Sequence, residues 1–275
     1  MMGLLQSARL DIAESLRARW FLIYALVFGG VLVLLLVTGL TESRVMGFTG
    51  LSRLLIVYIQ VCMAILPVFI LITTVRSVAG DREAGVFEYL LSLPVGLGAW
   101  YWGKITGRFV AVFVPVFAAV ALAMAWGAIA GYAVPWQAFG FNVLLLFSLS
   151  WCFLGIGMLI SSLARSPDVA QGTAFVVWLT LLLFLDLVLI GIMVREQAPP
   201  ELVVGIALAN PMQVFRTASM ALFDPELVLM GPAAFVILDA FGRAGYLVYG
   251  VLYPIFVGTL CAAGGFLLFR RGDLP

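Results

Sequence analysis

Six stretches of about 20 apolar residues constrain the fold of this chain more than any other feature of its sequence. A helix of about 20 apolar residues is long enough to cross the roughly 30 Å of hydrocarbon in a bilayer. We therefore expect an all-α polytopic membrane protein with six transmembrane helices, at about 21–40, 54–75, 109–130, 142–163, 175–194 and 246–269. The first stretch follows Arg17 and Arg19, but it is too long for a signal peptide and no small-residue cleavage site follows it, so we expect a retained helix.

The composition supports this fold class and excludes several classes of function. Of the 275 residues, 64% are hydrophobic and 11% are charged, whereas ordinary globular chains carry about 25% charged residues. We therefore expect a single transmembrane domain over residues 1–275, without a soluble domain. The near balance of 15 basic and 14 acidic side chains excludes a nucleic-acid-binding protein that acts through a basic face. The sequence has no histidine, which excludes histidine-based catalysis and histidine-ligated zinc.

The sulfur-containing residues do not form a recognisable site. Cys62, Cys152 and Cys261 each lie in an apolar stretch, so we interpret them as buried apolar side chains and not as a disulfide framework. A soft-metal site without histidine would need cysteine and methionine. Cys62 is adjacent to Met63, and Cys152 lies six residues before Met158, so neither pair shares a helix face. We predict no metal site and no cofactor bound by this chain.

The distribution of basic residues predicts the orientation of the spans. Ten of the 15 lysines and arginines lie in the N-terminal segment, the second loop, the fourth loop and the C-terminus. Because lysine and arginine are enriched on the cytoplasmic side, we expect both termini in the cytoplasm. The longest polar segments are then the cytoplasmic residues 76–108 and the outer residues 195–243.

The segment before the first span, at about 4–19, has helical periodicity. Apolar residues share one face and charged residues take the others: Leu5, Ala8, Ile12 and Leu16 against Arg9, Asp11, Glu14 and Arg17. This pattern predicts an amphipathic helix on the inner membrane surface. A polar extension of the first span is the alternative. On either interpretation the segment anchors the chain and is not a functional site.

Residues 80–94 form the most informative loop. Asp81 and Glu83 lie where a helix start favours negative charge, and Pro94 is expected to end that helix. Between them lies an apolar stripe: Val86, Tyr89, Leu90 and Leu93. A short helix presented between two spans is suited to binding a soluble partner. Alternatively, it lies at the membrane interface without a partner.

Two further polar segments carry a capping residue followed by proline. In the fourth loop, residues 161–168, Ser166 is expected to cap a helix that begins at Pro167. This loop is either a second cytoplasmic contact or a plain turn. On the outer side, Asn210 and Pro211 repeat the signal and begin a helix that ends before Asp224. We expect that helix to pack on the outer ends of the spans, as an outer gate or as a docking surface for an extracytoplasmic partner.

Asp186 is the one ionisable residue deep within an apolar stretch. A carboxylate in the bilayer centre costs at least about 2.5 kcal/mol on insertion scales, so we interpret it as part of a bundle interior, a subunit interface or a water-filled pathway. A protonated carboxyl that stabilises helix contacts is the alternative.

Residues 82–94 read Arg-Glu-Ala-Gly-Val-Phe-Glu-Tyr-Leu-Leu-Ser-Leu-Pro, and Gly103-Lys104 follows. This segment resembles the cytoplasmic loop of ABC-2-type permeases, the membrane subunits of ABC exporters. Their pattern is Glu-x-Gly-x-x-Glu, two aliphatic residues and proline, with Gly-Lys before the third span. Residues 8–12 with 16–20, 210–216 and 269–274 further resemble the NosY-type branch, which belongs to the ABC transporter that supports maturation of the copper centres of nitrous oxide reductase.

The resemblance implies a fold, a set of partners and a set of site residues. It implies the ABC-2 (type V) exporter permease fold and a homodimer in the bacterial inner membrane, with two cytoplasmic ATPase subunits and a periplasmic partner. Residues 83–93 would form the coupling helix, seated in a cleft of the ATPase. Leu10-Asp11 departs from the Lys-Glu that is frequent in the family. The implied ATPase-coupling residues are Arg82, Glu83, Gly85, Phe87, Glu88, Leu91, Pro94, Lys104, Arg165 and Asp168, and the implied outer gate or docking residues are Asn210, Pro211, Phe215 and Arg216.

The expected function is therefore that of a permease subunit without catalytic activity of its own. The sequence has no phosphate-binding loop of the Gly-x-x-x-x-Gly-Lys-Ser/Thr kind, so ATP and Mg²⁺ are expected on the partner subunit. The alternatives are an exporter of another substrate (a lipid, a drug or a sulfur species) and a mechanotransmission subunit that moves no cargo. An intramembrane aspartyl protease would need paired carboxylates, but Asp186 is the one acidic residue deep within a span. A secondary transporter would show inverted repeats, and we find no convincing internal repeat in the sequence. The sequence does not identify the transported substrate.

Overall fold

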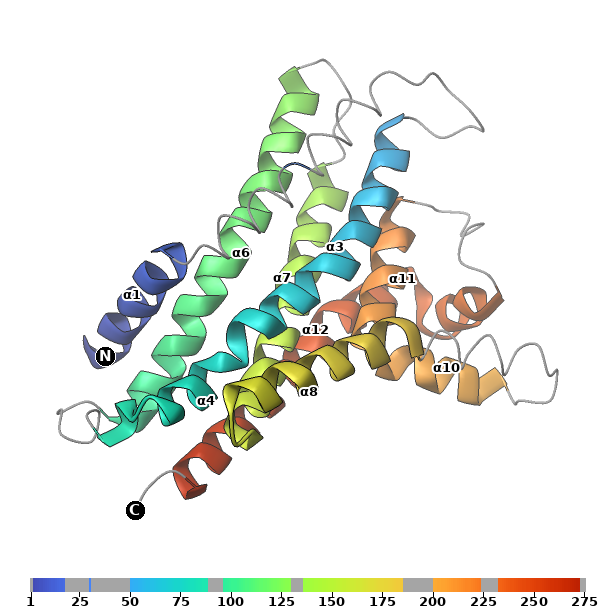
Figure 1. Ribbon diagram of the computed structural model, residues 1–275. Helices are drawn as coiled ribbons and strands as arrows, with labels where there is room; N and C mark the ends of the chain where they lie inside the picture. The colour runs from blue at the N-terminus through green and yellow to red at the C-terminus, as the bar shows by residue number, and fades with distance from the viewer. Residues whose placement is uncertain are drawn as a thin grey trace.

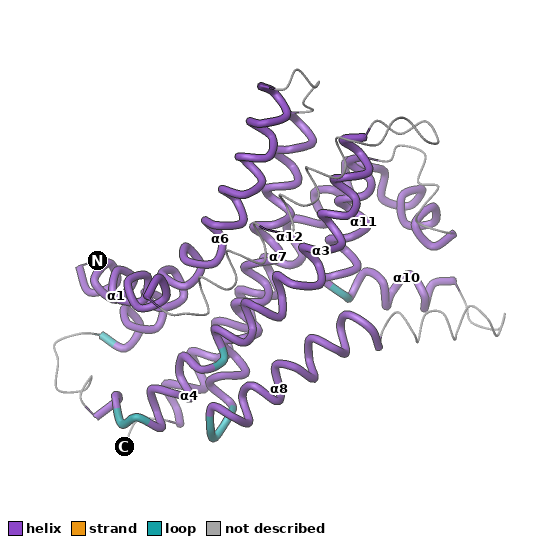
Figure 2. The backbone as a smooth tube through the Cα atoms, turned by 45° about the horizontal axis from the view of Figure 1, so that its top comes forward, coloured by secondary structure: helices purple, strands orange, loops and turns teal. Residues whose placement is uncertain are grey.

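The computed structural model describes residues 2–17, 30, 50–88, 96–129, 136–184, 200–223 and 232–272, and nearly all of these are helical (Figures 1 and 2). Figure 2 shows helices joined by short loops, and no strand, in this part of the chain. The first expected span, at 21–40, lies outside the described residues except for Gly30.

Four described helices are long and apolar enough to cross a membrane: Ile59–Glu83, Leu97–Trp126, Trp136–Leu163 and Gly242–Arg271. They correspond to the second, third, fourth and sixth expected spans. The fifth expected span, at 175–194, is described to residue 184, as a shorter apolar helix over Pro167–Leu183. The all-α polytopic class is thus confirmed, while the total of six spans stays a prediction.

The described elements follow one another in the order shown in Figure 1. They are α1 (Met2–Arg17), α3 (Gly50–Thr74), α4 (Arg76–Glu83), α6 (Leu97–Ile129), α7 (Trp136–Leu163), α8 (Pro167–Leu179), the π-helical segment η1 (Thr180–Phe184), α10 (Pro200–Ala209), α11 (Pro211–Phe223) and α12 (Pro232–Gly272).

Helix α6 begins well before the expected third span at 109. Gly103 and Lys104, which we expected in a loop before that span, lie inside α6. Lys104 and Arg108 do not interrupt the helix because lysine and arginine are good helix formers. Each also has a carboxylate partner on another element, as described below. The expected cytoplasmic segment 76–108 is therefore largely helical where it is described.

Helix α7 lies at the centre of the bundle and contacts α3, α4, α6, α8, α11 and α12. It packs most closely on α12, where Gly155 and Gly258 meet backbone to backbone. A Cβ atom at Gly155 would lie 2.0 Å from the carbonyl oxygen of Gly258, so neither position has room for a side chain. The Oγ of Ser148 donates a hydrogen bond to the carbonyl of Val251 at 2.6 Å. Small and hydroxyl-bearing residues of this kind let helices approach closely in lipid.

Helix α1 packs along the first half of α6 through Gly103 and Gly107, which share one helix face (Figure 1). A Cβ at Gly107 would lie 2.5 Å from the carbonyl oxygen of Ala8. The Oγ of Ser7 donates to the carbonyl of Trp100 at 3.1 Å. The packed face of α1 is therefore built from small residues.

This packing corrects our assignment of the α1 faces. We placed Asp11 away from the face of Ala8, but both residues are buried against α6. Leu5 and Leu16, assigned to the same face as Ala8, are 58% and 49% exposed. The short side chains allow the close contact with α6, and the exposed leucines are free to enter lipid.

Candidate functional site

The expected coupling segment lies where α4, the start of α6 and the ends of α7 and α12 gather, at the end of the bundle that also carries α1 (Figure 1). Helix α4 follows α3 after a single turn residue, Val75. The first backbone N–H groups of any helix lack intrahelical acceptors. Here the Oγ of Ser161, from α7, accepts hydrogen bonds from the N–H groups of Val78 at 2.9 Å and Ala79 at 3.1 Å. Ser161 thus fixes α4 against α7.

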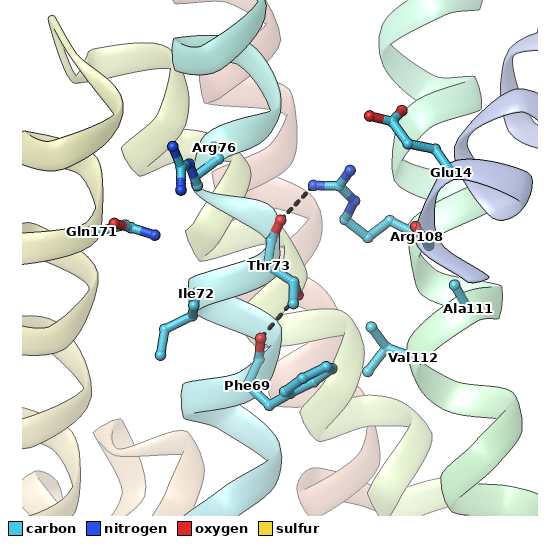
Figure 3. A pocket seen from close by; sticks show the side chains of 10 residues that line it. Glu14, Phe69, Ile72, Thr73, Arg76, Arg108, Ala111, Val112 and Gln171 are labelled. Atoms are coloured by element: carbon cyan, nitrogen blue, oxygen red, sulfur yellow. Dashed lines mark hydrogen bonds between the residues drawn. The ribbon is translucent and has the colours of Figure 1, made fainter. Parts of the chain in front are cut away.

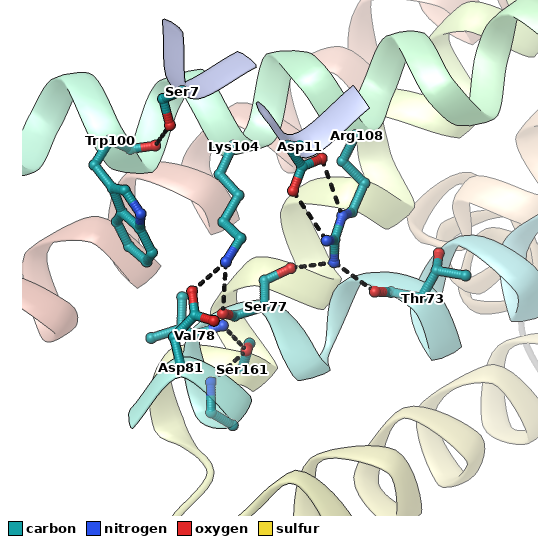
Figure 4. Close-up of polar contacts among 11 residues, drawn as sticks. Ser7, Asp11, Thr73, Ser77, Val78, Asp81, Trp100, Lys104, Arg108 and Ser161 are labelled. Atoms are coloured by element: carbon teal, nitrogen blue, oxygen red, sulfur yellow. Dashed lines mark hydrogen bonds and ion pairs between the residues drawn. The ribbon is translucent and has the colours of Figure 1, made fainter. Parts of the chain in front are cut away.

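Lys104 forms a first ionic junction, between α6 and α4 (Figure 4). Its ammonium forms an ion pair with Asp81 of α4 and donates to the carbonyl of Ser77 at 3.1 Å. It also lies 4.9 Å from the centroid of the Trp100 ring, a cation–π distance. The Lys104 side chain is only 11% exposed, so the group that we assigned to ATPase coupling joins α6 to α4 within this chain.

Arg108 forms a second ionic junction, one helical turn further along α6 (Figure 4). Its guanidinium donates to the Asp11 carboxylate of α1 at 3.0 Å and to the Thr73 carbonyl of α3 at 2.5 Å, and it also donates to the Oγ of Ser77. The Asp11 and Arg108 side chains are 3% and 13% exposed. A buried ion pair of this kind needs additional hydrogen bonds to offset desolvation, and these acceptors supply them. Arg108 therefore joins α1, α3, α4 and α6.

Arg82 ties α4 to the end of α7. Its guanidinium donates to the carbonyl of Ala164 at 2.7 Å and to that of Ser162 at 3.2 Å. The last carbonyls of a helix lack intrahelical donors and carry partial negative charge, so a cation is favourable there. Arg82, predicted as a coupling residue, thus positions the segment that follows it.

That segment turns at Gly85. Gly85 has φ of +69°, in the left-handed region that glycine adopts without strain. Residues 86–88 are again helical. We expected Asp81 and Glu83 at the start of one helix running to Pro94, but they lie in the last turn of α4. Two features explain this difference. Lys104 neutralises Asp81, so this carboxylate is tolerated away from a helix start. The turn at Gly85 separates α4 from the helical residues 86–88.

Phe87 holds the turn against the bundle. Its ring centroid lies 5.5 Å from that of Trp100 on α6 and 5.1 Å from that of Phe269 on α12, in edge-on and tilted contacts. Trp100 and Phe269 lie 5.4 Å apart, so the three rings form a closed cluster. Phe87 is buried, whereas Glu83 and Glu88 on either side of Gly85 are exposed.

The loop between α7 and α8 presents the neighbouring charges. Ser166 caps α8, accepting a hydrogen bond from the N–H of Val169, and Pro167 begins the helix, as predicted. Arg165 and Asp168 are exposed. We call Glu83, Glu88, Arg165 and Asp168 the end surface. Leu91 and Pro94 lie outside the described residues.

Helix α11 begins at Pro211, as predicted. The Oδ1 of Asn210 accepts from the N–H of Met212 at 3.0 Å, and its Nδ2 donates to the carbonyl of Leu181 in η1 at 2.7 Å. A π-helical turn disturbs the regular hydrogen-bond ladder, so Asn210 both caps α11 and binds η1.

The outer gate or docking residues are largely enclosed by their own chain. Asn210, Pro211 and Phe215 are buried, and Arg216 is half-buried. This burial favours a role in holding α11 on the bundle over direct contact with a partner. Asp186 lies outside the described residues.

Sequence reasoning missed three residues of the junction: Asp11, Ser77 and Ser161. Asp11 was assigned to a different face of α1 from Ala8, Ser161 was placed in the fourth loop, and Ser77 was not singled out within residues 76–108. One available signal was the helical spacing of Asp11 from Ser7 and Ala8, which places a single acid on a stripe of small residues.

The chain belongs to the ABC-2 family of transporter proteins, whose sequence model matches residues 5–274. It is accordingly an ABC-2-type permease, the multi-pass membrane component of an ABC transporter in the bacterial inner membrane, and membership of this family implies ATPase partner subunits. The chain is 27% identical, over 231 residues, to the probable ABC transporter permease protein NosY of Stutzerimonas stutzeri, covering 82% of this chain and 83% of that protein. It is 28% identical, over 223 residues, to the probable ABC transporter permease protein NosY of Pseudomonas aeruginosa, covering 79% and 81%. The expected resemblance to NosY-type permeases is confirmed.

Proposed function

We propose that this chain couples ATP hydrolysis by two cytoplasmic ATPase subunits to export or conformational work across the inner membrane, in maturation of the copper centres of nitrous oxide reductase. The similarity to two NosY permeases over about four fifths of each chain supports the assignment to this process. One structural observation carries the coupling role: Glu83 and Glu88 are exposed on a turn that Arg82 and Phe87 anchor in the bundle.

The anchoring supplies a mechanism for coupling. Arg82 ties the turn to α7, and Phe87 ties it to α6 and α12. A force applied to Glu83 and Glu88 would therefore move these helices together, as a rigid-body tilt, and not simply bend a loop. In this proposal the end surface contacts the ATPase subunit. The position of that surface is set by Arg82, Phe87 and Lys104.

The proposed assembly is a homodimer with both termini in the cytoplasm. A two-fold dimer presents two equivalent end surfaces, one for each ATPase subunit. Leu91 and Pro94 are expected to extend each contact. A periplasmic partner is expected to meet the opposite side of the membrane, near α11.

Copurification from membranes tests the coupling role. The double variant Glu83→Ala/Glu88→Ala is expected to lose the ATPase subunit while keeping the melting temperature of the unaltered chain, because both side chains are exposed. Arg9→Ala is the control, since it removes an exposed charged side chain of α1 that is not part of the end surface. Undiminished copurification of the double variant would contradict the proposal.

Two measurements separate export from conformational work. In proteoliposomes containing both subunits, ATP-dependent movement of copper(I) would support export, and ATP-dependent movement of a lipid, drug or sulfur species would support the alternative exporters. If no flux depends on ATP but a periplasmic partner changes conformation with ATP, the mechanotransmission alternative is favoured.

Deletion of the gene for this chain tests the assigned process. In cells that lack the chain, nitrous oxide reductase is expected to be deficient in copper. A fully copper-loaded enzyme would contradict the assigned process.

A further inference from the structure

A cavity of about 210 Å³ lies beside the ionic junction of Arg108, between α1, α3, α4, α6 and α8 (Figure 3). Its lining includes charged and amide side chains, namely Glu14, Arg76, Arg108 and Gln171, and apolar ones, including Phe69 and Val112. No step of the coupling mechanism uses this cavity.

The charges at the cavity are balanced. Arg108 is already bound by Asp11, Thr73 and Ser77. Within the described part of the chain, Arg76 and Glu14 make no hydrogen bond or ion pair, and both are exposed. One unpaired cation and one unpaired anion therefore line the same cavity. Figure 3 shows Glu14 reaching in from α1, with Arg76 and Gln171 on the opposite side.

The polar and apolar parts of the lining are separated along the helices. Phe69 precedes Arg76 by seven residues, so it lies about 10 Å further along the helix, away from the end surface. Val112 follows Arg108 by one turn of α6, in the same direction. In Figure 3 Phe69 and Val112 lie at the end of the cavity opposite Arg76 and Glu14. The cavity thus has a charged entrance and an apolar continuation.

We propose that this cavity binds the headgroup of a zwitterionic aminophospholipid. The phosphate would accept hydrogen bonds from the Arg76 guanidinium and the Gln171 amide, and the primary ammonium would donate to the Glu14 carboxylate. The first part of an acyl chain would lie along Phe69 and Val112. An anionic headgroup would need a surplus of positive charge, which Glu14 and Asp11 remove. With the proposed orientation the site faces the inner leaflet, and it does not depend on the ATPase contact.

Native mass spectrometry of the delipidated full-length chain, with any copurifying subunits, tests the proposal. Phosphatidylethanolamine, phosphatidylglycerol and phosphatidylcholine with identical acyl chains are titrated separately. We expect phosphatidylethanolamine to bind most tightly. Arg76→Gln is expected to weaken its binding at least about tenfold, because a charge-assisted contact to the phosphate is lost. Arg76→Lys, which keeps the charge, is expected to retain most of the binding.

Glu14→Gln provides a second, independent variant. It is expected to abolish the preference for phosphatidylethanolamine over phosphatidylcholine, because the quaternary ammonium of choline has no N–H donor for Glu14 to recognise. Arg9→Gln, an exposed charge of α1 outside the cavity, is the matched control and is expected to change neither affinity nor preference.

Three results would overturn the proposal. The first is tighter binding of phosphatidylglycerol than of phosphatidylethanolamine, which would indicate an anion site. The second is binding unchanged by both Arg76→Gln and Glu14→Gln. The third is competition by water-soluble glycerophosphoethanolamine at the same concentration as the lipid, which would show that the acyl chains contribute nothing.

Discussion

Arg108 brings a full charge into a bundle of apolar helices, and its surroundings explain how the fold tolerates it. Asp11 faces it at 3.0 Å, and the Thr73 carbonyl and the Ser77 hydroxyl accept hydrogen bonds from its Nη1. A buried ion pair adds little net stability, but breaking it by removing one partner leaves an uncompensated buried charge. The pair therefore specifies how α1 is placed on α6.

Asp11→Ala tests this pairing. It is expected to lower the free energy of unfolding by about 3–5 kcal/mol, because Arg108 loses its counter-charge. The double variant Asp11→Ala/Arg108→Met is expected to recover part of that loss, and thermal unfolding in detergent measures both. Arg9→Ala, at an exposed position of the same helix, serves as the control. Equal melting temperatures for Asp11→Ala and Arg9→Ala would refute the expectation.

Two adjacent serines at the end of α7 provide a matched pair. Ser161 accepts the N–H groups of Val78 and Ala79, whereas Ser162 donates to Met158 of its own helix. Ser161→Ala removes the side-chain acceptor that two buried N–H groups share, so we expect a loss of about 1–3 kcal/mol of stability. Ser162→Ala is expected to cost clearly less. The reverse order of melting temperatures would mean that Ser161 does not hold α4.

At the scale of the element, close contact between helices decides which faces are buried. Helix α1 uses Ser7, Ala8 and Asp11 to reach the glycine face of α6, and leaves larger leucines exposed. Hydrophobic periodicity alone predicts the opposite, because it assumes that the most apolar face meets the protein. In lipid, an apolar face gains nothing special from helix contact, and small residues that permit close approach are favoured instead.

Gly107→Ala tests the α1–α6 contact. The added methyl would lie 2.5 Å from the carbonyl oxygen of Ala8, so α1 must shift, with an expected loss of about 1–3 kcal/mol. Trypsin cleavage at Arg17 is expected to accelerate. Gly140→Ala is the control, because nothing lies within 4 Å of a Cβ there and alanine favours a helix. Unchanged proteolysis of Gly107→Ala would indicate that α1 is not held by this contact.

Gly85→Ala tests the turn after α4. Nothing lies within 4 Å of a Cβ at Gly85, so only the left-handed backbone opposes the substitution, at about 1–2 kcal/mol. We expect weaker copurification of the ATPase subunit, because the turn carrying Glu83 and Glu88 would change direction. Gly80→Ala, within helical α4, is expected to be neutral or stabilising. If the two variants behave alike in copurification and melting, the turn geometry is not important for coupling.

At the scale of the whole molecule, the two ionic junctions and the aromatic cluster make one end of the bundle a connected unit. The unit includes α1, α4, the first half of α6 and the ends of α7 and α12. Away from it, Asn210 links η1 to α11. A movement imposed on the end surface would reach α11 through α7, which contacts both regions.

Cysteine labelling tests the orientation of this unit. Glu83→Cys, Asp168→Cys and Arg271→Cys are each expected to react with a membrane-impermeant maleimide from the cytoplasmic side only. Trp136→Cys is expected to react from the other side, because Trp136 lies at the far end of α7, about 40 Å from the α7–α8 loop. The unaltered chain, whose cysteines are buried or half-buried, gives the background. Labelling of Glu83→Cys and Arg271→Cys from opposite sides would contradict the orientation.

Much of the fold was predictable because the relevant signals are local. Apolar stretches located the four described long helices, and the cap-and-proline signals at Ser166 and Asn210 located the starts of α8 and α11. The candidate site was predictable only as a segment. Arg82 and Lys104 were identified, but as contacts for a partner, whereas the structure directs both side chains into their own chain.

The sequence by itself determined that this chain is a helical membrane protein, because the length and apolarity of a stretch depend only on neighbouring residues. Its membership of the ABC-2 family was also readable from the sequence, through the resemblance of residues 82–94 and the family match over residues 5–274. Only the tertiary structure decided which charges pair, which face of α1 is buried and where the coupling segment is anchored. Asp81 and Lys104 lie 23 positions apart, and Asp11 and Arg108 lie 97 apart. Helical periodicity carries no information over such separations, and the partners meet because α1, α4 and α6 pack side by side.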